Sequence, residues 1–301
     1  MSTFFACAEG GSSCLLLCAH ILKFCFIIGD RLTLETLAPA RAACQTIYVL
    51  GDAHLGAQNP GAEAEKLRRF TSFIDALRGQ RESQLILCGD LFDFWFEYRR
   101  VVARSHFRTL ARLADLIDSG VPVDYLAGNH DFWLGTFLRE EVGVTVHPDA
   151  LELTQSGRRI LLLHGDGLRR RDHLYRLMKG LLRHPLAVAA YRLLHPDWGI
   201  PLAHFCAHLS RESQRTERYD DGDYRAWACS RLEEAYDLVV MGHTHVPALL
   251  AHGRGWYVNT GAWMSTFTYA RIAAGVPALF QWDGQVSRPY FPGQASRTDE
   301  L

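Results

Sequence analysis

The sequence predicts an α/β fold in which helices cover the faces of a sheet. Two patterns alternate along the chain: short apolar runs rich in Leu and β-branched residues, and segments whose apolar residues recur at helical spacing. This alternation is typical of β–α–β units. The chain has 301 residues, 48% of them hydrophobic and 22% charged, which suffices for a large core and excludes disordered, collagenous and coiled-coil proteins.

Seven strands are expected from Thr46 onward, each of them a short apolar run. Most are followed closely by Gly, Asp or His, which favours a turn at the strand end. The expected strands are Ile47–Leu50, Leu85–Cys88, Val123–Ala127, Ile160–Leu163, Leu238–Met241, Trp256–Val258 and Ala278–Gln281.

Two helices are expected between the first three of these strands. In each, apolar residues recur every three or four positions, and Gly120 follows the second set as a helix stop. The two sets are Leu67, Phe70, Ile74 and Leu77, and Leu110, Leu113, Leu116 and Ile117.

Residues 168–235 interrupt the alternation, because no strand is expected there. Arg169 to His195 is expected to be helical with a break at Pro185, since proline cannot continue a helix. This segment carries seven Arg or Lys residues against one acid, Asp172, together with several leucines. We predict a main domain over 45–301 that contains a helical insertion, or cap, at about 168–235.

Residues 1–44 differ in composition from the rest of the chain. Leu15 to Ile28 is an apolar run interrupted by His20 and Lys23, and it is short for a bilayer span of about 20 residues. The residues before it contain no Lys or Arg, unlike a secretory signal peptide. We expect a poorly ordered extension, or translated sequence upstream of the true start. A membrane-surface anchor and a signal or span are the alternatives.

Charge and cysteine content narrow the function classes. Thirty-two Lys and Arg residues against 33 Asp and Glu give a net charge of −1, which offers nucleic acid no global attraction. Five of the eight cysteines lie within the first 44 residues and no CxxC pair occurs, so we expect neither a zinc site of that kind nor a disulfide framework. Reduced thiols and a cytoplasmic location are expected.

Five short polar motifs stand at the ends of expected strands. Such strand ends converge in an open α/β sheet, so side chains that follow them can meet in one site. A glycine adjoins each motif and permits a sharp turn. The motifs contribute Asp52 and His54, Asp90 and Asp93, Asn129 with His130 and Asp131, His164 and Asp166, and His243 with His245.

These residue types predict a metal centre. Asp, Asn and His side chains without Cys form a site for Mn²⁺, Fe or Zn²⁺. A single Asp or His after a strand is more often a cap, a turn residue or a structural residue, but five such motifs in one chain favour a shared site. Seven ligands are too many for one ion, whereas two ions about 3.5–4 Å apart, bridged by a carboxylate, account for them.

The motifs D-x-H, G-D, G-N-H-D, H-G and G-H-x-H occur in this order and resemble those of the calcineurin-like metallophosphoesterases, from about Thr46 to Pro292. The resemblance implies a four-layer α/β/β/α sandwich and two divalent ions, expected to be Mn²⁺. By position it implies one ion held by Asp52, His54 and His245, another held by Asn129, His164 and His243, and a bridge at Asp90.

A narrower resemblance is to the UDP-2,3-diacylglucosamine diphosphatases of lipid A biosynthesis, through LGDAHLG, GDLFDFWFEYR, GNHDFWLG, HGDGL and LHPDWGIPLAH. It implies attack on the α-phosphorus of UDP-2,3-diacylglucosamine, with release of UMP and 2,3-diacylglucosamine 1-phosphate (lipid X), and a helical insertion that covers the acyl chains. One departure is His130, where the proteobacterial enzymes carry Arg. The implied substrate-binding residues are Asn129, His130, Asp172, Tyr175, Arg183 and His243.

His130 and Asp131 are the expected catalytic residues. Two cations lower the pKa of a shared water and neutralise the charge that develops on phosphoryl oxygens. We expect His130 to protonate the leaving group or to steady the transition state, with Asp131 orienting its ring. Trp95 and Trp133 are expected to pack around the site, and stacking on a nucleobase is the alternative.

The insertion suggests two uses for its arginines and leucines. Arginines bind phosphate through planar donors and leucines could receive lipid tails. The same charges could attach the protein peripherally to the anionic inner membrane, and a solvated basic face is the plainer alternative. The expected partners are therefore a nucleotide-linked glycolipid and the inner-membrane surface, and not nucleic acid.

Two other functions fit the sequence. The chain could be a metallophosphoesterase that acts on another nucleotide or phosphodiester, or a non-catalytic scaffold of the same fold. All seven implied metal ligands are present, which favours an enzyme over a scaffold. A nuclease is disfavoured because the clustered basic residues coincide with a Leu-rich helix.

Overall fold

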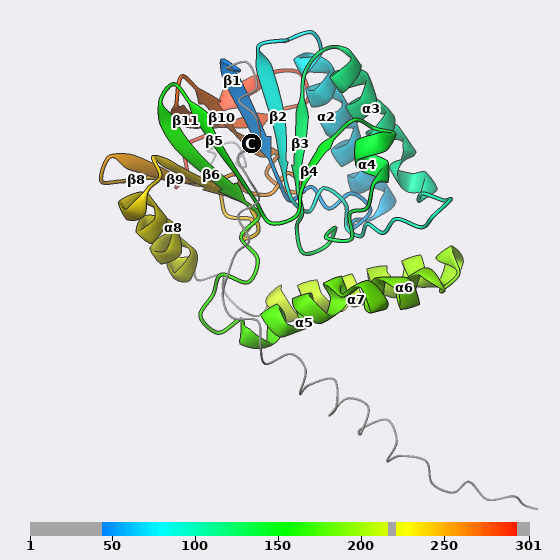
Figure 1. Ribbon diagram of the computed structural model, residues 1–301. Coiled ribbons are helices and arrows are strands. Elements are labelled where there is room, and N and C mark those ends of the chain that lie inside the picture. Colours follow the sequence, from blue (N-terminus) through cyan, green and yellow to red (C-terminus); the bar gives the residue numbers. More distant parts are fainter. Residues whose placement is uncertain (1–43, 216–220, 294–301) are drawn as a thin grey trace, which may run out of the picture. The chain divides into compact units, whose positions relative to one another are not determined.

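The computed structural model describes residues 44–215 and 221–293. Within them, two sheets are packed together and helices lie on their outer faces (Figure 1). The predicted N-terminal extension, 1–44, lies outside the described residues except for Cys44. Among the described residues, Cys88, Cys206 and Cys229 are free thiols.

The first sheet has seven strands. In spatial order they are β12 (Ser287–Pro289), β11 (Val276–Trp282), β10 (Thr268–Ala273), β1 (Thr46–Leu50), β2 (Ser83–Cys88), β3 (Val123–Leu126) and β4 (Thr145–His147). The pairs from β1 to β4 are parallel, whereas the pairs from β1 to β12 are antiparallel. The parallel half places the carboxyl ends of β1, β2 and β3 at one edge.

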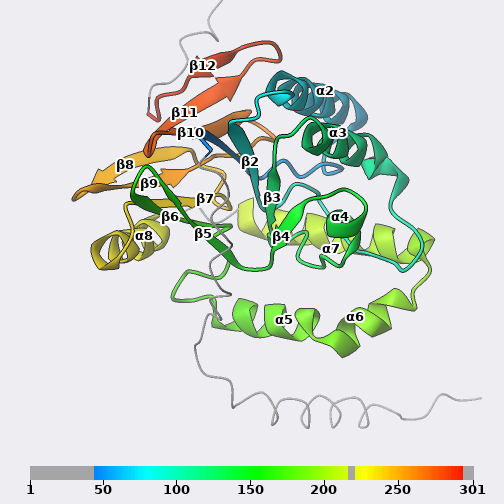
Figure 2. The same ribbon diagram turned by 45° about the horizontal axis from the view of Figure 1, so that its top comes forward.

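The second sheet has five strands (Figure 2). In spatial order they are β5 (Ala150–Gln155), β6 (Arg158–Leu163), β7 (Leu238–Met241), β9 (Gly255–Asn259) and β8 (Ala248–His252). Here β6, β7 and β9 are mutually parallel, and the two outer strands pair antiparallel.

All seven predicted strands are confirmed, with ends that differ by at most two residues. Five strands were not predicted: β4, β5, β8, β10 and β12. Four of these are the edge strands of the two sheets. An edge strand buries less surface than a central one and so lacks a continuous apolar run. The fifth, β10, is an internal strand whose sequence, TYARIA, mixes polar and small residues.

The helices outside the predicted insertion cover the first sheet. They are α2 (Pro60–Leu77), the 3₁₀ turn η1 (Arg104–His106), α3 (Phe107–Asp118) and the short α4 (Phe137–Glu140). The start of α2 is fixed by Asn59, whose side-chain oxygen accepts from the backbone N–H of Ala62, followed by Pro60 in the first turn. The two predicted helices are therefore confirmed as α2 and α3.

Three apolar clusters fill the spaces between four layers. The first lies between α2, α3 and the first sheet and includes Phe70 and Leu113. The second lies between the sheets and includes Val49 and Val240. The third lies between the second sheet and α8 (Gly222–Glu234) and includes Leu232. The predicted α/β/β/α sandwich is confirmed by these layers.

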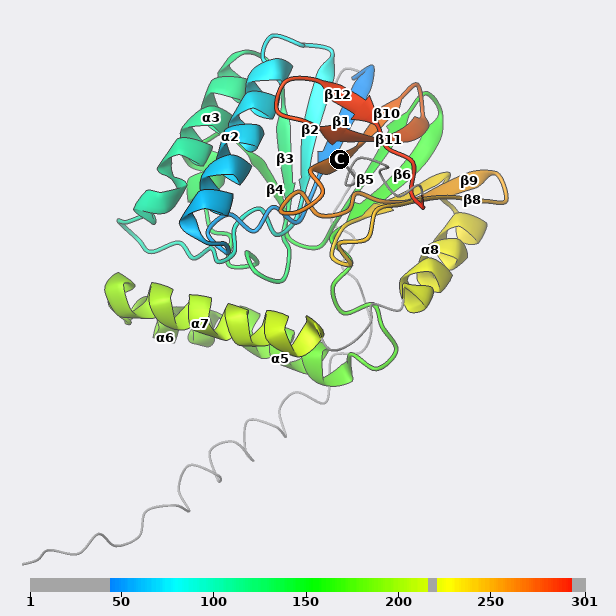
Figure 3. The same ribbon diagram turned by 180° about the vertical axis from the view of Figure 1, so that it is seen from behind.

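The cap helices are α5 (His173–Arg183), α6 (Pro185–Arg192) and α7 (Pro196–Arg215), and they lie together beyond one end of the strands (Figures 1 and 3). The predicted break at Pro185 is confirmed, but the helix begins at His173 and not at Arg169. The predicted insertion, 168–235, also contains α8, which packs on the second sheet. None of the helices in the described ranges has both the length and the hydropathy that crossing a bilayer requires.

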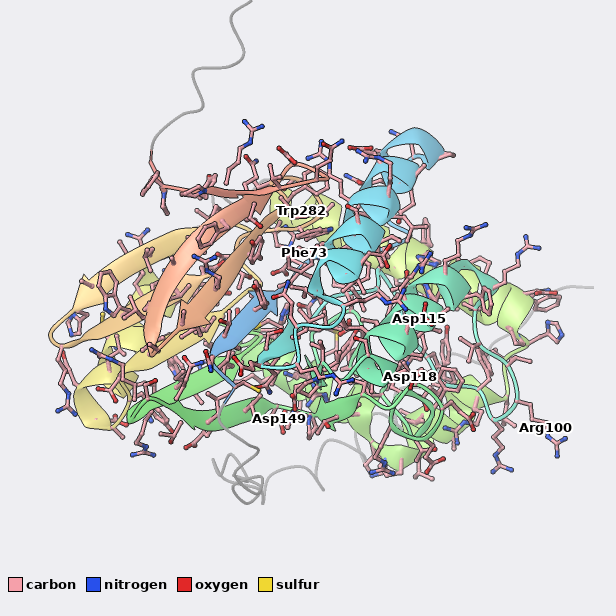
Figure 4. All side chains as sticks on the ribbon, turned by 90° about the horizontal axis from the view of Figure 1, so that it is seen from above. Phe73, Arg100, Asp115, Asp118, Asp149 and Trp282 are labelled. Carbon is pink, nitrogen blue, oxygen red and sulfur yellow. The ribbon has the colours of Figure 1, made fainter. Side chains whose placement is uncertain are left out.

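Phe73 is the centre of an aromatic cluster under α2, where it lies beside Trp282 (Figure 4). Its ring lies 4.8 Å from Tyr269, 5.2 Å from Trp263 and 5.6 Å from Trp282, and the residue is 1% exposed. We predict that Phe73→Ala lowers the free energy of unfolding by about 3–5 kcal/mol, since it leaves a cavity in a packed core. Urea denaturation measures this loss.

The matched control for this prediction is Phe107→Ala. Phe107 is 72% exposed at the start of α3, so its truncation removes little buried surface. Equal losses of stability in the two variants would contradict the position of Phe73 in the core.

Candidate metal centre

The five predicted motifs follow β1, β2, β3, β6 and β7, so both sheets contribute to one site. In the described part of the chain, three overlapping groups of acidic and imidazole side chains have ligand atoms within 4.8 Å of one another. These groups are Asp52 with His54 and His245, His54 with Asp90 and His130, and Asp52 with Asp90 and His164.

The first group joins the loops after β1 and β7. The Nε2 atoms of His54 and His245 lie 3.2 Å apart, and Oδ1 of Asp52 lies 3.3 Å from Nε2 of His245. This carboxylate oxygen is buried and makes no hydrogen bond within the described residues. A buried carboxylate oxygen beside two imidazole nitrogens is costly unless a proton on an imidazole or a bound cation compensates its charge, and these donor types fit a divalent ion.

A second set of ligand atoms surrounds His164. Its Nδ1 donates to the carbonyl oxygen of Cys88 over 2.9 Å, which leaves Nε2 to face the site. Nε2 lies 3.0 Å from Oδ1 of Asn129 and 3.4 Å from Oδ2 of Asp90. Burial would lower the pKa of His164, but the charge and hydrogen bond of Asp90 raise it to about 10. A proton on His164 therefore occupies the place where a cation could bind.

Asp90 lies between the two sets. Its Oδ2 is 3.6 Å from Nε2 of His54 and 3.4 Å from Nε2 of His164. Burial alone would raise the pKa of Asp90, but the charges of His164 and His130 hold it well below its usual range. One ionised carboxylate shared by two sets of ligands has the arrangement of a bridging ligand.

His243 stands at the margin of this cluster. Its backbone N–H donates to Oδ2 of Asp52 over 2.9 Å, and its ring centroid lies 5.0 Å from that of His164. Burial and the charge of His164 lower the pKa of His243 to about 4, so its imidazole is neutral at pH 7 and able to ligate. The structure thus brings all seven predicted ligands to one region.

The backbone is strained at five of the seven predicted ligands. Positive φ angles occur at Asp52 (53°), His54 (42°), Asp90 (52°), His243 (66°) and His245 (61°). Such angles are rare in residues other than glycine, and each costs on the order of 1–3 kcal/mol. Strain of this kind persists only where the surroundings enforce it, so neighbouring side chains must hold these loops in place.

Two glycines allow the loops to approach one another closely. A Cβ atom on Gly128 would lie 2.1 Å from Oδ1 of Asp90, and one on Gly89 would lie 2.4 Å from Nδ1 of His164. The glycines noted in the motifs are therefore required here by the space around the acid and the imidazole.

Asp131 holds the Asp90 loop and does not orient the ring of His130, contrary to our expectation. Its carboxylate accepts from the backbone N–H groups of Asp90 (3.2 Å), Leu91 (2.8 Å) and Gly128 (2.8 Å). The hydroxyl of Tyr125 donates to the same carboxylate. These three backbone donors and the Tyr125 hydroxyl occupy the roughly four acceptor positions of the carboxylate, so none is left for the ring of His130.

His130 is oriented by Asp93. Its Nδ1 donates to the backbone oxygen of Asp93 over 2.9 Å, and its own backbone N–H donates to Oδ1 of Asp90 over 2.9 Å. The ring lies edge-on to His54, with centroids 4.7 Å apart. Because Nδ1 of His130 is engaged by Asp93, Nε2 is the ring nitrogen that is left for a further contact.

The expected substrate-binding residues of the insertion lie at different places. The Tyr175 hydroxyl donates to Asp166 over 2.6 Å, and Lys179 donates to the same carboxylate oxygen over 2.6 Å. Arg183 pairs with Asp149 over 2.8 Å. Asp172 is half-buried just before α5, and its side chain does not cap that helix.

The two tryptophans of the motifs differ in position. Trp95 is 2% exposed and packs on Phe92 and His106, which confirms the expected packing role. Trp133 donates from Nε1 to the carbonyl oxygen of Leu182 in α5, over 2.8 Å, and so contacts the cap helices.

The sequence reasoning missed Lys66 and His204. Lys66 is fully buried in α2, where its Nζ donates to the backbone oxygen of His54 over 2.6 Å and pairs with Glu63 over 3.0 Å. In the sequence, Lys66 directly precedes the apolar residues that predict α2, and nothing in that pattern indicates that this lysine is buried. His204 belongs to the segment LHPDWGIPLAH, and the family resemblance of that segment implies no role for this residue.

A family model described as calcineurin-like phosphoesterase matches residues 45–247. Three relatives named UDP-2,3-diacylglucosamine hydrolase are similar to this chain. The protein from Porphyromonas gingivalis is 38% identical over 168 residues, which cover 56% of this chain and 64% of that protein. The chain therefore spans less than two thirds of that relative's length.

The other two relatives are covered more fully. The protein from Serratia proteamaculans is 28% identical over 246 residues, covering 79% of this chain and 98% of the relative. The protein from Pseudomonas aeruginosa is 30% identical over 211 residues, covering 67% of this chain and 83% of the relative.

Lys66 provides a test of how the centre is held. We predict that Lys66→Met weakens Mn²⁺ binding by about 10–100-fold, because the strained backbone of His54 loses a buried donor. Electron paramagnetic resonance titration of free Mn²⁺ measures the affinity. Arg68→Met is the control, since Arg68 lies on the same helix in an exposed pair with Glu65 and should change affinity little. Equal Mn²⁺ affinity in wild type and Lys66→Met would contradict this role.

Proposed function

The chain belongs to the calcineurin-like phosphoesterase family, and from this premise we propose that it is a metal-dependent hydrolase that cleaves the pyrophosphate bond of UDP-2,3-diacylglucosamine. The products are UMP and 2,3-diacylglucosamine 1-phosphate, lipid X of lipid A biosynthesis. The names of the three relatives support this substrate. The observation that carries the proposal is the buried carboxylate of Asp90 shared by two sets of ligand atoms.

The proposed ligands divide as the motif order implied. Asp52, His54 and His245 would hold one ion, Asn129, His164 and His243 would hold the second, and Asp90 would be shared by both. The donors are oxygen and imidazole nitrogen without thiolate, which suits Mn²⁺. The ions, when bound, supply Lewis acidity and an activated water.

His130 is proposed as the proton donor to the leaving group. Because Nδ1 donates to the backbone of Asp93, the ring is held in one orientation and Nε2 is the atom that gives up a proton. His130 also stands where the proteobacterial enzymes carry Arg. An imidazole can transfer a proton at neutral pH, whereas a guanidinium can only neutralise charge.

A cavity between the core and the cap helices is the proposed site for the lipid part of the substrate. Its volume is about 230 Å³, and Phe96, Phe132, Trp133, Val188, Arg183 and Arg192 line it. Aromatic and aliphatic walls favour an acyl chain, and the two arginines, which share the lining with Glu97, favour a phosphate group. Asn129, His130, Asp172, Tyr175 and His243 complete the proposed substrate-binding residues.

The cap helices carry an exposed apolar surface that supports peripheral membrane attachment. Among the cap residues whose side chains the structure describes, ten large apolar side chains are exposed: Leu174, Leu177, Met178, Leu181, Leu186, Leu193, Leu194, Trp198, Leu202 and Phe205. Arg169, Arg170 and Arg171 precede this surface. Apolar side chains flanked by arginine are typical of a surface that binds an anionic leaflet. We therefore propose a cytoplasmic protein that attaches to the inner membrane.

Hydrolysis of another nucleotide or phosphodiester is the second candidate. The departure at His130 favours it, because the general family carries histidine at this position. A small phosphodiester hydrolysed as fast as the glycolipid would favour this second function.

The proposed reaction predicts where oxygen is incorporated. In ¹⁸O-labelled water, attack on the α-phosphorus places the label in UMP and leaves 2,3-diacylglucosamine 1-phosphate unlabelled, and mass spectrometry of both products measures this.

We predict that His130→Ala slows turnover by about 10²–10⁴-fold, because general acid catalysis is lost.

Metal content is the control for this variant. His130 is not a proposed metal ligand, so His130→Ala should retain the metal content of wild type. Label in lipid X would refute the proposed point of attack, and turnover within about threefold of wild type would exclude acid catalysis by His130.

Membrane attachment predicts a charge-dependent flotation. Changing Arg169, Arg170 and Arg171 to Glu should weaken binding to phosphatidylglycerol vesicles by on the order of 100-fold or more, since each basic residue contributes about 1 kcal/mol. The control is the same charge change at Arg139, Arg254 and Arg288, which are exposed outside the cap helices. Equal flotation of the two triple variants would contradict the proposed attachment of the cap helices to the membrane.

A further inference from the structure

A hydrogen bond joins the cap helices to a loop of the proposed metal centre. His204 of α7 donates from Nδ1 to Oδ2 of Asp93 over 3.0 Å. Asp93 is 1% exposed and stands three residues after Asp90 in the loop that follows β2. The acceptor is therefore a buried carboxylate, whose hydrogen bonds are strong and costly to remove.

The carboxylate of Asp93 lies among three imidazoles. Its Oδ1 is 3.9 Å from Nδ1 of His54 and 3.8 Å from Nδ1 of His130, and His204 is the closest of the three. The backbone oxygen of Asp93 also accepts from Nδ1 of His130. The Nδ1 atoms of His54 and His130 thus face Asp93. The position of the Asp93 side chain therefore affects how the two imidazole rings are oriented.

The ring of His204 also packs directly on the loops of the centre. A Cβ atom on Gly56 would lie 3.7 Å from Cε1 of His204, so the ring lies close to the loop that carries His54. The ring centroid of Phe94, the residue after Asp93, lies 6.1 Å away at an angle of 70°. One cap residue therefore contacts both the loop after β1 and the loop after β2.

We infer that His204 is a positioning residue, which acts through Asp93 to couple the docking of the cap helices to the orientation of His54 and His130. The inference rests on the proposed function, because it assigns His54 to a metal ion and His130 to the reaction. The inference goes beyond that function, because it makes the geometry of the metal centre depend on a residue of the cap helices. Partners that orient a metal-binding imidazole are worth about 10–100-fold in metal affinity or activity.

The test uses two substitutions of His204 in the full chain. His204→Ala removes the donor, whereas His204→Asn keeps an N–H near the position of Nδ1. His195→Ala is the matched control, because His195 is a cap histidine whose side chain is 71% exposed. The readouts are the visible absorption of the Co²⁺-substituted protein, the affinity for Mn²⁺, and the KM and kcat for bis(p-nitrophenyl) phosphate.

We expect His204→Ala to change the Co²⁺ spectrum, to weaken Mn²⁺ binding by about 10–100-fold and to lower kcat with little change in KM. His204→Asn should restore these properties to within about threefold of wild type, and His195→Ala should match wild type. Thermal melting of each variant confirms that it is folded, and a folded His204→Ala with these losses supports the inference.

Two results would overturn the inference. An unchanged Co²⁺ spectrum and Mn²⁺ affinity in a folded His204→Ala would show that His204 does not position the metal centre. The same losses in His204→Asn as in His204→Ala would show a packing role. Failure of the proposed function is distinguishable, because a different natural substrate would leave the Co²⁺ and Mn²⁺ readouts unaffected.

Discussion

The structure depends on the burial of acidic oxygens and imidazole nitrogens against one another at the strand ends. Asp52 and Asp90 are both essentially inaccessible, and the histidines around them lie within 4 Å. Two buried carboxylates so close together need compensating positive charge. Protons on histidine supply part of it, as the raised pKa of His164 indicates, and divalent ions compete for the same positions. The chemistry of the site is therefore a consequence of its electrostatics.

This electrostatic arrangement is maintained by a surrounding layer of side chains. The ligand loops have left-handed backbones at residues that ordinarily avoid them, so their conformation must be enforced from outside. Asp131 does this for the loop after β2 by accepting its backbone N–H groups. Lys66 does it for the loop after β1 by donating to the carbonyl oxygen of His54. Both residues are buried, and a hydrogen bond is stronger in a low-dielectric interior than in water. These bonds can therefore hold a strained backbone in place.

The cap helices are joined to the sandwich at the same loops. Asp93 and Asp166 each follow a proposed metal ligand by two or three residues, and each carboxylate accepts a donor from a cap helix. Burial would raise the pKa of Asp166, but Lys179 and His164 lower it to about 2, so this carboxylate stays ionised. The helices α5 and α7 are thus anchored on loops that carry proposed metal ligands.

The sequence by itself determined the central strands, the helices α2 and α3, and the order of the motifs. Central strands and core helices bury continuous apolar patterns, which are visible without knowledge of their neighbours. The edge strands and β10 were not predicted, because they are strands by virtue of hydrogen bonding to a neighbouring strand and their composition does not indicate this pairing. The contacts of Asp131, Lys66 and His204 were decided only by the tertiary structure. His204 and Asp93 are 111 positions apart, and no local pattern encodes a contact that depends on how a cap docks on a sandwich.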